Sequence, residues 1–364
     1  MYRNLEIKNF RCFKHLKIEE LERINLIAGK NGAGKSSLLE AVFLHAGAYN
    51  PELVMSIQGL RGIEQVKLAR GAWVETPFDS IFRDFNSKEK IEIAATLSPN
   101  GKRSITLKVL REKEELSVIS TASQPISQNA AVAAGVVSAD QSFPVLELEY
   151  KDKRNKKGKT YLILSESGVR ITPAPPPPPF PAHIITGHHS GPSKDFPDRF
   201  GKIETQLRKQ EVVDVLKIVE PRIKDLTIVH YAGKPILHAN IGLRRLVPLF
   251  LMGGGIMRLT ALIVELIKAE NGIILFDEIE NGLHSSALEE VWTAIGEAAR
   301  RNNTQVFATT HSFECITAAH RAISRQDKYS FKLHRLDRVD EEIQHVAYSR
   351  DGLDAAIEMN FEVR

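Results

Sequence analysis

One stretch decides the fold of this chain: Gly29-Lys30-Asn31-Gly32-Ala33-Gly34-Lys35-Ser36. It fits the phosphate-binding pattern G-x-x-x-x-G-K-[ST] in the setting that the pattern requires. The apolar run 24–28 before it predicts a buried strand, and residues 36–43 after it predict a helix with one apolar face. The sequence therefore predicts a strand, a loop and a helix that bind the phosphates of a nucleoside triphosphate.

The residue types in this loop suit phosphate chemistry. Glycines let the backbone wrap closely around phosphate oxygens, and the N-terminus of the following helix offers unpaired N–H groups and a partial positive charge. We expect Lys35 to reach the β- and γ-phosphates and the Ser36 hydroxyl to hold Mg²⁺. The residues expected to contact the nucleotide here are Gly29, Asn31, Gly32, Gly34, Lys35, Ser36 and Ser37.

A second apolar run ends in two acids. Ile273-Ile274-Leu275-Phe276 leads into Asp277 and Glu278, which is typical of a central strand in a parallel sheet with carboxylates at its C-terminal edge. We expect Asp277 to hold Mg²⁺, directly or through water. Glu278 is expected to orient and deprotonate the attacking water.

Two further segments fit the same site. Residues 305–312 predict another buried strand, and His311 near its end is expected to hydrogen-bond the γ-phosphate. Gly253-Gly254-Gly255 precedes an apolar helix and predicts a second anion-binding helix N-terminus. Because one phosphate loop does not need two such termini, the pattern favours two copies packed head to tail, each covering the other's γ-phosphate. A tight turn before a core helix is the alternative.

Composition sets the broad class. The 364 residues, 43% of them hydrophobic, can bury a large core as one α/β domain or two lobes. The net charge of +4 permits contact with nucleic acid without requiring it. Cys12 and Cys315 offer neither a disulfide framework nor a metal cluster. No segment has the roughly 18 apolar residues of a membrane span, so we expect a soluble, cytoplasmic protein without a membrane partner.

Strand patterns dominate the first half of the chain. Residues 3–28 suggest two strands before the phosphate loop, and 88–118 suggest a hairpin turning at Pro99-Asn100-Gly101. Strands are also predicted at 145–150 and 160–171. The basic run 151–159 between them is either a charged hairpin tip or a contact to DNA phosphates.

The middle of the chain is less regular. Residues 119–142 lack periodicity and suggest a mobile loop or an insertion. The proline-rich segment 173–181 suggests a stiff spacer, with a docking ligand for a partner domain as the alternative. The elements expected after it are mostly helix over 195–220, a strand pair over 223–243, helix 256–270, strand 273–276, helix 285–301, strand 305–310 and a mixed tail.

In their order, these segments resemble an ABC-type ATPase. Ile7-Lys8-Asn9-Phe10-Arg11-Cys12-Phe13 resembles the opening of the branch that contains RecF, SMC and Rad50 proteins and OLD-family ATPases. The runs 276–284 (FDEIENGLH) and 307–315 (FATTHSFEC) resemble OLD-like stand-alone ATPases of bacteria most closely. The resemblance covers roughly residues 1–75 and 200–364.

The resemblance implies an α/β fold of the ABC-type P-loop NTPases. It has a mixed or parallel central sheet, an antiparallel β subdomain and a helical signature lobe. The expected division is an N-terminal nucleotide-binding half over 1–85, an inserted β lobe over 86–182, a helical signature lobe over 183–270 and a C-terminal nucleotide-binding half over 271–364.

Some residues depart from the pattern of transporter ATPases. Gly253, or Met252 in a shifted register, occupies the place of the signature serine, so that contact must come from backbone N–H groups and turnover is expected to be slow. His284 stands where transporters have aspartate in the dimer-crossing loop. Resemblance also implies nucleotide contacts from Arg11, Asn281 and His284. No glutamine-loop residue is assigned.

Two patterns are missing from the sequence. No long heptad run separates the phosphate loop from Asp277, which excludes coiled-coil arms like those of SMC and Rad50 proteins. OLD-family nucleases carry a Toprim domain, which needs on the order of 100 residues. Only about 50 residues follow His311, and Asp337 and Asp340 have the wrong spacing for its metal site. We therefore expect that this chain is not itself a nuclease.

The sequence leads to one main hypothesis and one rival. The main hypothesis is a homodimeric switch, driven by ATP and Mg²⁺, that controls a separately encoded effector such as a Toprim-type nuclease in bacterial anti-phage defence. The rival is a RecF-like DNA-binding ATPase in repair. The motor subunit of a transporter is disfavoured, because its glutamine loop is not evident and the dimer-crossing loop differs.

Overall fold

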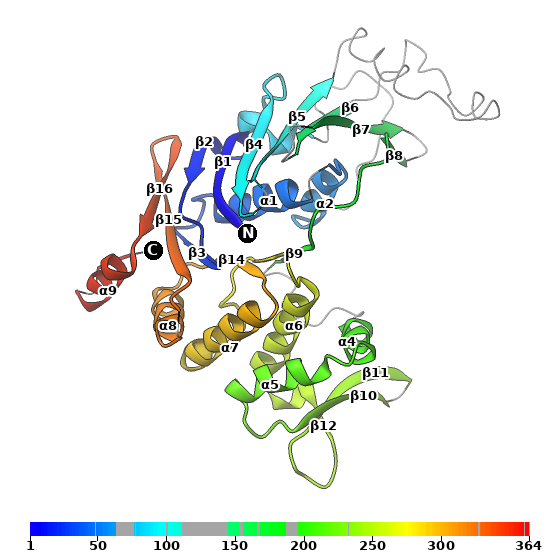
Figure 1. Cartoon of the computed structure of the whole chain (residues 1–364), viewed down its shortest axis with the longest axis vertical. Helices are drawn as coiled ribbons and strands as arrows, with labels where there is room; N and C mark the ends of the chain where they lie inside the picture. The colour runs from blue at the N-terminus through cyan, green and yellow to red at the C-terminus, as the bar shows by residue number, and fades with distance from the viewer. Residues whose placement is uncertain are drawn as a thin grey trace, which may run out of the picture.

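The computed structural model has three β-sheets with helices packed between and below them (Figure 1). It describes residues 1–47, 49–62, 76, 78–99, 101–110, 145–152, 156–165, 168–186, 196–231, 233–326, 328–359 and 361–363. The segment predicted as a mobile loop, 119–142, lies outside the described residues. So do residues 153–155 of the basic run.

The first sheet is antiparallel and has seven strands in the order β2-β1-β4-β5-β6-β7-β8. Buried and half-exposed residues alternate strictly along β4, as expected when one face of a sheet packs on a core. The strands are β1 (Tyr2–Phe10), β2 (Phe13–Ile18), β4 (Ile91–Leu97), β5 (Gly101–Leu110), β6 (Val145–Lys151), β7 (Lys157–Ser165) and β8 (Gly168–Thr172).

Two of the sequence predictions concern strands of this antiparallel sheet. The basic run joins β6 to β7, whose first residue pairs with Lys151, so the predicted hairpin is confirmed. The single strand predicted over 160–171 is wrong, because β7 and β8 pair antiparallel with Ser165 opposite Gly168. The polar stretch Ser165-Glu166-Ser167-Gly168 has the residue types that favour a chain reversal.

The second sheet has six strands in the order β16-β15-β3-β14-β13-β9, and every neighbouring pair except β15 with β16 is parallel. The short strand β9 was absent from the sequence prediction. It pairs with β13 at the edge of the sheet. The strands are β3 (Ile24–Ala28), β9 (Ala182–Ile185), β13 (Ile273–Phe276), β14 (Gln305–Thr309), β15 (Phe331–Val339) and β16 (Glu342–Tyr348).

The parallel sheet is buried on both faces. On one side, α1 (Lys35–Ala46) and α2 (Leu53–Gly59) lie between the two large sheets, as Figure 1 shows. Alternate residues of β13 divide between two cores: Leu275 packs with α1 and the antiparallel sheet, whereas Ile274 packs with the helices on the opposite face. Burial on both faces explains the apolar runs that the sequence has at β3 and β13.

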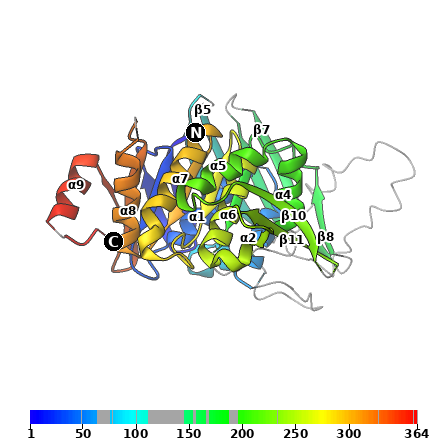
Figure 2. The same cartoon turned by 90° about the horizontal axis from the view of Figure 1, so that it is seen from below.

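The helices of the second core come from the later part of the chain. They are α4 (Phe196–Thr205), α5 (Lys209–Val219), α6 (Gly254–Lys268), α7 (Leu288–Arg301) and α8 (Phe313–Ser324). A three-stranded sheet of β10 (Asp225–Tyr231), β11 (Lys234–Asn240) and β12 (Val247–Pro248) lies beside α4 and α5. The view in Figure 2 places α9 (Arg350–Glu358) at one end of the molecule and β8 at the other.

These elements match most of the sequence prediction. The predicted helices at 256–270 and 285–301 and the strands at 273–276 and 305–310 are confirmed with small shifts at their ends. The domain boundaries at residues 85, 182 and 270 stay predictions. Within the described part of the chain, no helix has the length and apolar character needed to cross a bilayer.

Two buried histidines make folding stability depend on pH. Burial, with Arg103 nearby, lowers the pKa of His45 to about 3. Burial, with His345 and Lys332 nearby, does the same for His334. Unfolded histidine binds its proton near pH 6.5, so this stability is present above pH 6.5 and is lost as the pH falls toward 3. Each histidine should lower the free energy of unfolding by about 1.4 kcal/mol when the pH falls from 7.5 to 5.5.

Urea unfolding at the two pH values measures this effect. The two histidines together lower the free energy of unfolding as the pH falls, and His334→Gln should remove about half of that decrease. His230→Gln is the control, because His230 lies exposed on β10. Equal pH dependence in wild type and His334→Gln would contradict the account.

Candidate nucleotide-binding site

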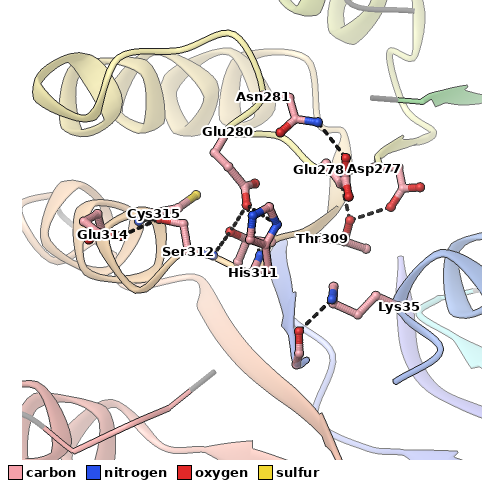
Figure 3. Close-up of polar contacts among 12 residues, drawn as sticks. Lys35, Asp277, Glu278, Glu280, Asn281, Thr309, His311, Ser312, Glu314 and Cys315 are labelled. Carbon is pink, nitrogen blue, oxygen red and sulfur yellow. Dashed lines mark hydrogen bonds and ion pairs between the residues drawn. The ribbon is translucent and has the colours of Figure 1, made fainter. Parts of the chain in front are cut away.

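The sheet register brings the sequence-predicted polar residues to one edge. Phe276 of β13 pairs with Ala308 of β14, and Thr309 pairs with Ile27 of β3. Parallel strands end at the same edge, so the phosphate loop after β3 and the residues that follow β13 and β14 converge there. Figure 3 shows this convergence.

The phosphate loop leads directly into α1, which begins at Lys35. Gly34 precedes it with φ of 90°, and no side chain caps the helix N-terminus, whose N–H groups are therefore open to an anion. Lys35 Nζ donates to the carbonyl oxygens of Gly29 (2.6 Å) and Lys30 (3.1 Å). Burial lowers the pKa of Lys35, whereas Asp277 and the two glutamates that follow it act in the opposite direction.

Ser36 and Asp277 meet although they are 241 positions apart in the sequence. Ser36 Oγ donates to Asp277 Oδ1 over 3.1 Å, and Thr309 Oγ1 donates to the same oxygen over 2.6 Å. Mg²⁺ prefers oxygen ligands and is usually held by one or two protein groups, with water and phosphate oxygens completing its octahedron. A hydroxyl and a carboxylate from two chain segments fit that ion.

Glu278 is held at its backbone and its side chain. Its φ of 50° is unusual for a residue other than glycine and costs on the order of 1 kcal/mol. Its N–H donates to Thr309 Oγ1 (2.8 Å), and its carbonyl accepts from Arg258 Nη2 (3.1 Å). Asn281 Nδ2 donates to its carboxylate over 2.6 Å (Figure 3). Such strained, over-determined residues cluster at active sites.

His311 lies at the same edge and contacts Glu280 (Figure 3). Its backbone N–H donates to Glu280 Oε1 over 3.0 Å, and its ring Nδ1 lies 3.2 Å from that oxygen. The His311 side chain is half exposed, whereas that of Glu280 is 11% exposed. A largely buried carboxylate thus supports an accessible imidazole.

Arg11 packs beside the phosphate-loop helix. Its Nε donates to Glu40 Oε2 of α1 (3.1 Å), and its Nη1 donates to the Ser80 carbonyl (2.8 Å). Its buried Nη2 has no partner among the described residues. Burial lowers the pKa of Arg11, and Glu40 opposes that shift. The nucleotide contact predicted for Arg11 stays a prediction.

The glycine-rich signature is exposed. A methyl group added at Gly253 or Gly254 would meet no atom within 4 Å, and at Gly255 it would meet only Leu283 of the loop after β13. The predicted contact of Gly253, Gly254 and Gly255 with a second copy therefore stays untested by this single chain. The His284 side chain accepts from the Ser286 N–H and so caps the short helix over 285–287. Its predicted contact with the nucleotide stays a prediction.

Sequence reasoning missed four residues of this site. Thr309 joins Asp277 to Glu278, Glu280 supports His311, and Arg258 holds the Glu278 carbonyl. Arg338 Nη2, from β15, donates to the Gly32 carbonyl over 3.1 Å. Glu280 and Thr309 are close in sequence to residues that were predicted, and this proximity could have identified them. Nothing in the sequence indicated Arg258 or Arg338, because only tertiary packing places them at the site.

The phosphate loop also yields a prediction on stability. A Cβ at Gly34 would lie 2.7 Å from Cys12 Sγ and 2.9 Å from Cε1 of the Phe13 ring, whereas one at Gly32 would meet nothing within 4 Å. Both glycines have positive φ. Gly34→Ala should therefore lower the free energy of unfolding by about 2 to 4 kcal/mol, and the control Gly32→Ala by about 1 kcal/mol. Urea melts compare the two variants, and equal losses would show that crowding by Cys12 and Phe13 does not matter.

Comparison with known proteins shows the family and the fold. Residues 1–329 match the RecF/RecN/SMC N terminal domain. The chain belongs to this family. Its fold is therefore that of the ABC-type ATPase heads, and the predicted fold class is confirmed. An SMC head solved in complex with the C-winged helix domain of ScpA aligns over 98% of this chain and 99% of its own, with a TM-score of 0.50 and 13% identity, which shows likeness of fold alone.

Two relatives of this chain show different kinds of similarity. A protein of Helicobacter pylori named ATP/GTP phosphatase is 22% identical over 97% of both chains. The DNA double-strand break repair Rad50 ATPase of Archaeoglobus fulgidus is 57% identical over 44 residues, which are 12% of this chain and 5% of that protein. The first likeness is global and weak, and the second is local and strong.

Proposed function

We propose that this chain binds ATP with Mg²⁺, hydrolyses it slowly as a homodimer, and thereby controls a separately encoded effector in bacterial anti-phage defence. The contact of Ser36 with Asp277 carries the proposal, because it joins the phosphate loop to the acidic strand end. The OLD-like subtype and the cytoplasmic location belong to the same proposal.

The site residues divide the chemical work. Lys35 neutralises charge on the β- and γ-phosphates, and Glu278 accepts a proton from the attacking water. Ser36 and Asp277 hold Mg²⁺, which supplies positive charge to the phosphate oxygens. Asn281 donates to the Glu278 carboxylate and so fixes which oxygen can accept the proton. Hydrolysis of a nucleoside triphosphate is supported by the name of the near full-length relative, an ATP/GTP phosphatase.

The exposed signature supports the homodimer. Phe250 and Leu251, just before the glycines, are 51% and 67% exposed. Apolar side chains beside an uncapped helix N-terminus suit a surface that another chain covers. In the dimer, the backbone N–H groups of Gly254 and Gly255 would face the partner's γ-phosphate.

The effector is the part of the proposal that depends on resemblance. The runs 276–284 and 307–315 resemble OLD-like stand-alone ATPases, which are typically paired with a separately encoded enzyme, often a Toprim-type nuclease. After β14, the described residues form α8, β15, β16 and α9, and β15 extends the central sheet. These residues extend the ATPase core, and the proposal places the toxic activity in another polypeptide on the strength of the resemblance alone.

A DNA clamp in repair is the second candidate. It is favoured by the strong local identity with a Rad50 ATPase and by the exposed lysines Lys151, Lys156 and Lys157 at the β6–β7 hairpin. A clamp would bind DNA only with ATP, and its affinity would fall steeply with salt because lysines displace counterions from phosphates.

Co-purification distinguishes the candidates. Tagged Glu278→Gln protein is isolated from its native host in Mg-ATP, and Lys35→Ala protein serves as the matched control that cannot use the site. A stoichiometric enzyme enriched only with Glu278→Gln supports the switch. Enriched DNA and recombination proteins without an effector would replace it with the clamp.

A further inference from the structure

Glu280 contacts both residues that directly follow β14. A single carboxylate oxygen, Oε1, accepts from Thr310 Oγ1 (2.8 Å) and from the His311 backbone N–H (3.0 Å), and lies 3.2 Å from His311 Nδ1. Glu280 follows β13, whereas Thr310 and His311 follow β14. The carboxylate therefore fixes the loop after one strand to the end of its neighbour.

This close approach favours one form of the imidazole. A carboxylate can only accept hydrogen bonds, and with its oxygen 3.2 Å from Nδ1 it stabilises a ring that carries a proton on Nδ1 over one with a lone pair there. Nε2 then remains as the ring nitrogen with no contact to a described residue. When the ring takes a second proton, Nε2 becomes a donor and the Glu280 carboxylate supplies the opposite charge. Carboxylates that accept from the far nitrogen of a histidine orient functional imidazoles in this way.

The burial of Glu280 shows that the arrangement has a structural cost. Its second oxygen, Oε2, is buried and has no partner among the described residues. The guanidinium of Arg258 on α6 interacts electrostatically with Glu280, and its Nε is likewise buried without a described partner. An unpaired buried polar atom is unfavourable, and such a cost is typical of functional sites.

We propose that Glu280 is a positioning residue for ATP hydrolysis. It holds the His311 ring with its proton on Nδ1 and directs Nε2 to the γ-phosphate, to which the charged ring donates. Glu280 itself touches neither nucleotide nor water, and no proton passes between the two side chains. The inference rests on the proposed function, because it assumes that His311 meets the γ-phosphate of bound ATP.

Kinetics on full-length protein test the proposal. Glu280→Gln keeps the size of the side chain and its accepting oxygen but removes the charge. We expect kcat to fall about tenfold or more, with the Kd for ATP within about threefold of wild type. The double variant Glu280→Gln with His311→Ala should be no slower than His311→Ala alone, because Glu280 acts through His311. Glu314→Gln is the matched control, since Glu314 contacts Ser312 on the same loop.

Nitrogen NMR of the histidine rings gives a readout that a merely structural role would not move. The His311 signal, assigned by its loss in His311→Ala, should show the proton on Nδ1 in wild type and lose that preference in Glu280→Ala. This test needs no Glu280 variant to fold, because a neutral His311 ring with its one proton on Nε2 in the wild-type protein already overturns the proposal. Additive losses in the double variant would also overturn it.

The outcomes separate this inference from the proposed function. If His311→Ala is slow but Glu280→Gln hydrolyses at the wild-type rate, only the inference fails. If His311→Ala hydrolyses ATP at the wild-type rate, the proposed contact of His311 with the γ-phosphate fails as well.

Discussion

Lys35→Ala is expected to abolish measurable ATP hydrolysis and to weaken ATP binding by about 100-fold or more. The Lys35 ammonium is largely buried and is held by two loop carbonyls, so it is already placed where phosphates would bind. Its loss leaves the phosphate charges without their main side-chain partner. Binding is measured with a fluorescent ATP analogue, and hydrolysis by phosphate release.

Lys30→Ala is the matched control for this prediction. Lys30 belongs to the same loop, but its side chain is exposed and only its carbonyl contacts Lys35. It should bind and hydrolyse ATP nearly as wild type does. Full ATP binding by Lys35→Ala would mean that the nucleotide does not bind at this loop.

Glu278→Gln is expected to slow hydrolysis by about 100- to 10,000-fold while leaving the Kd for ATP within about threefold. The amide keeps the size of the side chain and can still accept from Asn281, but it cannot take a proton from water. Binding and chemistry should therefore separate in this variant. Single-turnover hydrolysis and equilibrium ATP binding measure the two quantities.

Glu290→Gln controls for the loss of a carboxylate. Glu290 is exposed in the first turn of α7 and lies outside the site. Its variant should hydrolyse ATP at the wild-type rate. A wild-type rate in Glu278→Gln would assign the base to another residue.

The sequence was most informative where short-range patterns determine the structure. The phosphate loop, the strand before it and the helix after it follow from glycine spacing and apolar periodicity over about 20 residues. The strand ending at Asp277 was predictable for the same reason, since a four-residue apolar run must be buried on both faces. Local chemistry therefore placed both halves of the site.

Long-range contacts were not predictable. Glu280 meets His311 only because the parallel register aligns the ends of β13 and β14. Arg258 of α6 donates to the Glu278 carbonyl, and Arg338 of β15 donates to the Gly32 carbonyl. No spacing in the sequence encodes these pairings, because they depend on how separate elements pack.

Weak local signals caused the remaining errors. Strand β9 has four residues after a proline-rich segment, which is too short for a clear periodicity. It takes its conformation from pairing with β13. The reversal between β7 and β8 was hidden for a related reason, because apolar residues on both sides gave the appearance of one strand.

The molar mass of Glu278→Gln in solution tests the central claim most directly, that ATP binding joins two chains and hydrolysis releases them. Light scattering after size exclusion compares the variant in Mg-ATP, in Mg-ADP and without nucleotide, with Lys35→Ala as the control. The account predicts the mass of two chains for Glu278→Gln only in Mg-ATP, and the mass of one chain for Lys35→Ala throughout. A mass that does not change with nucleotide would contradict it.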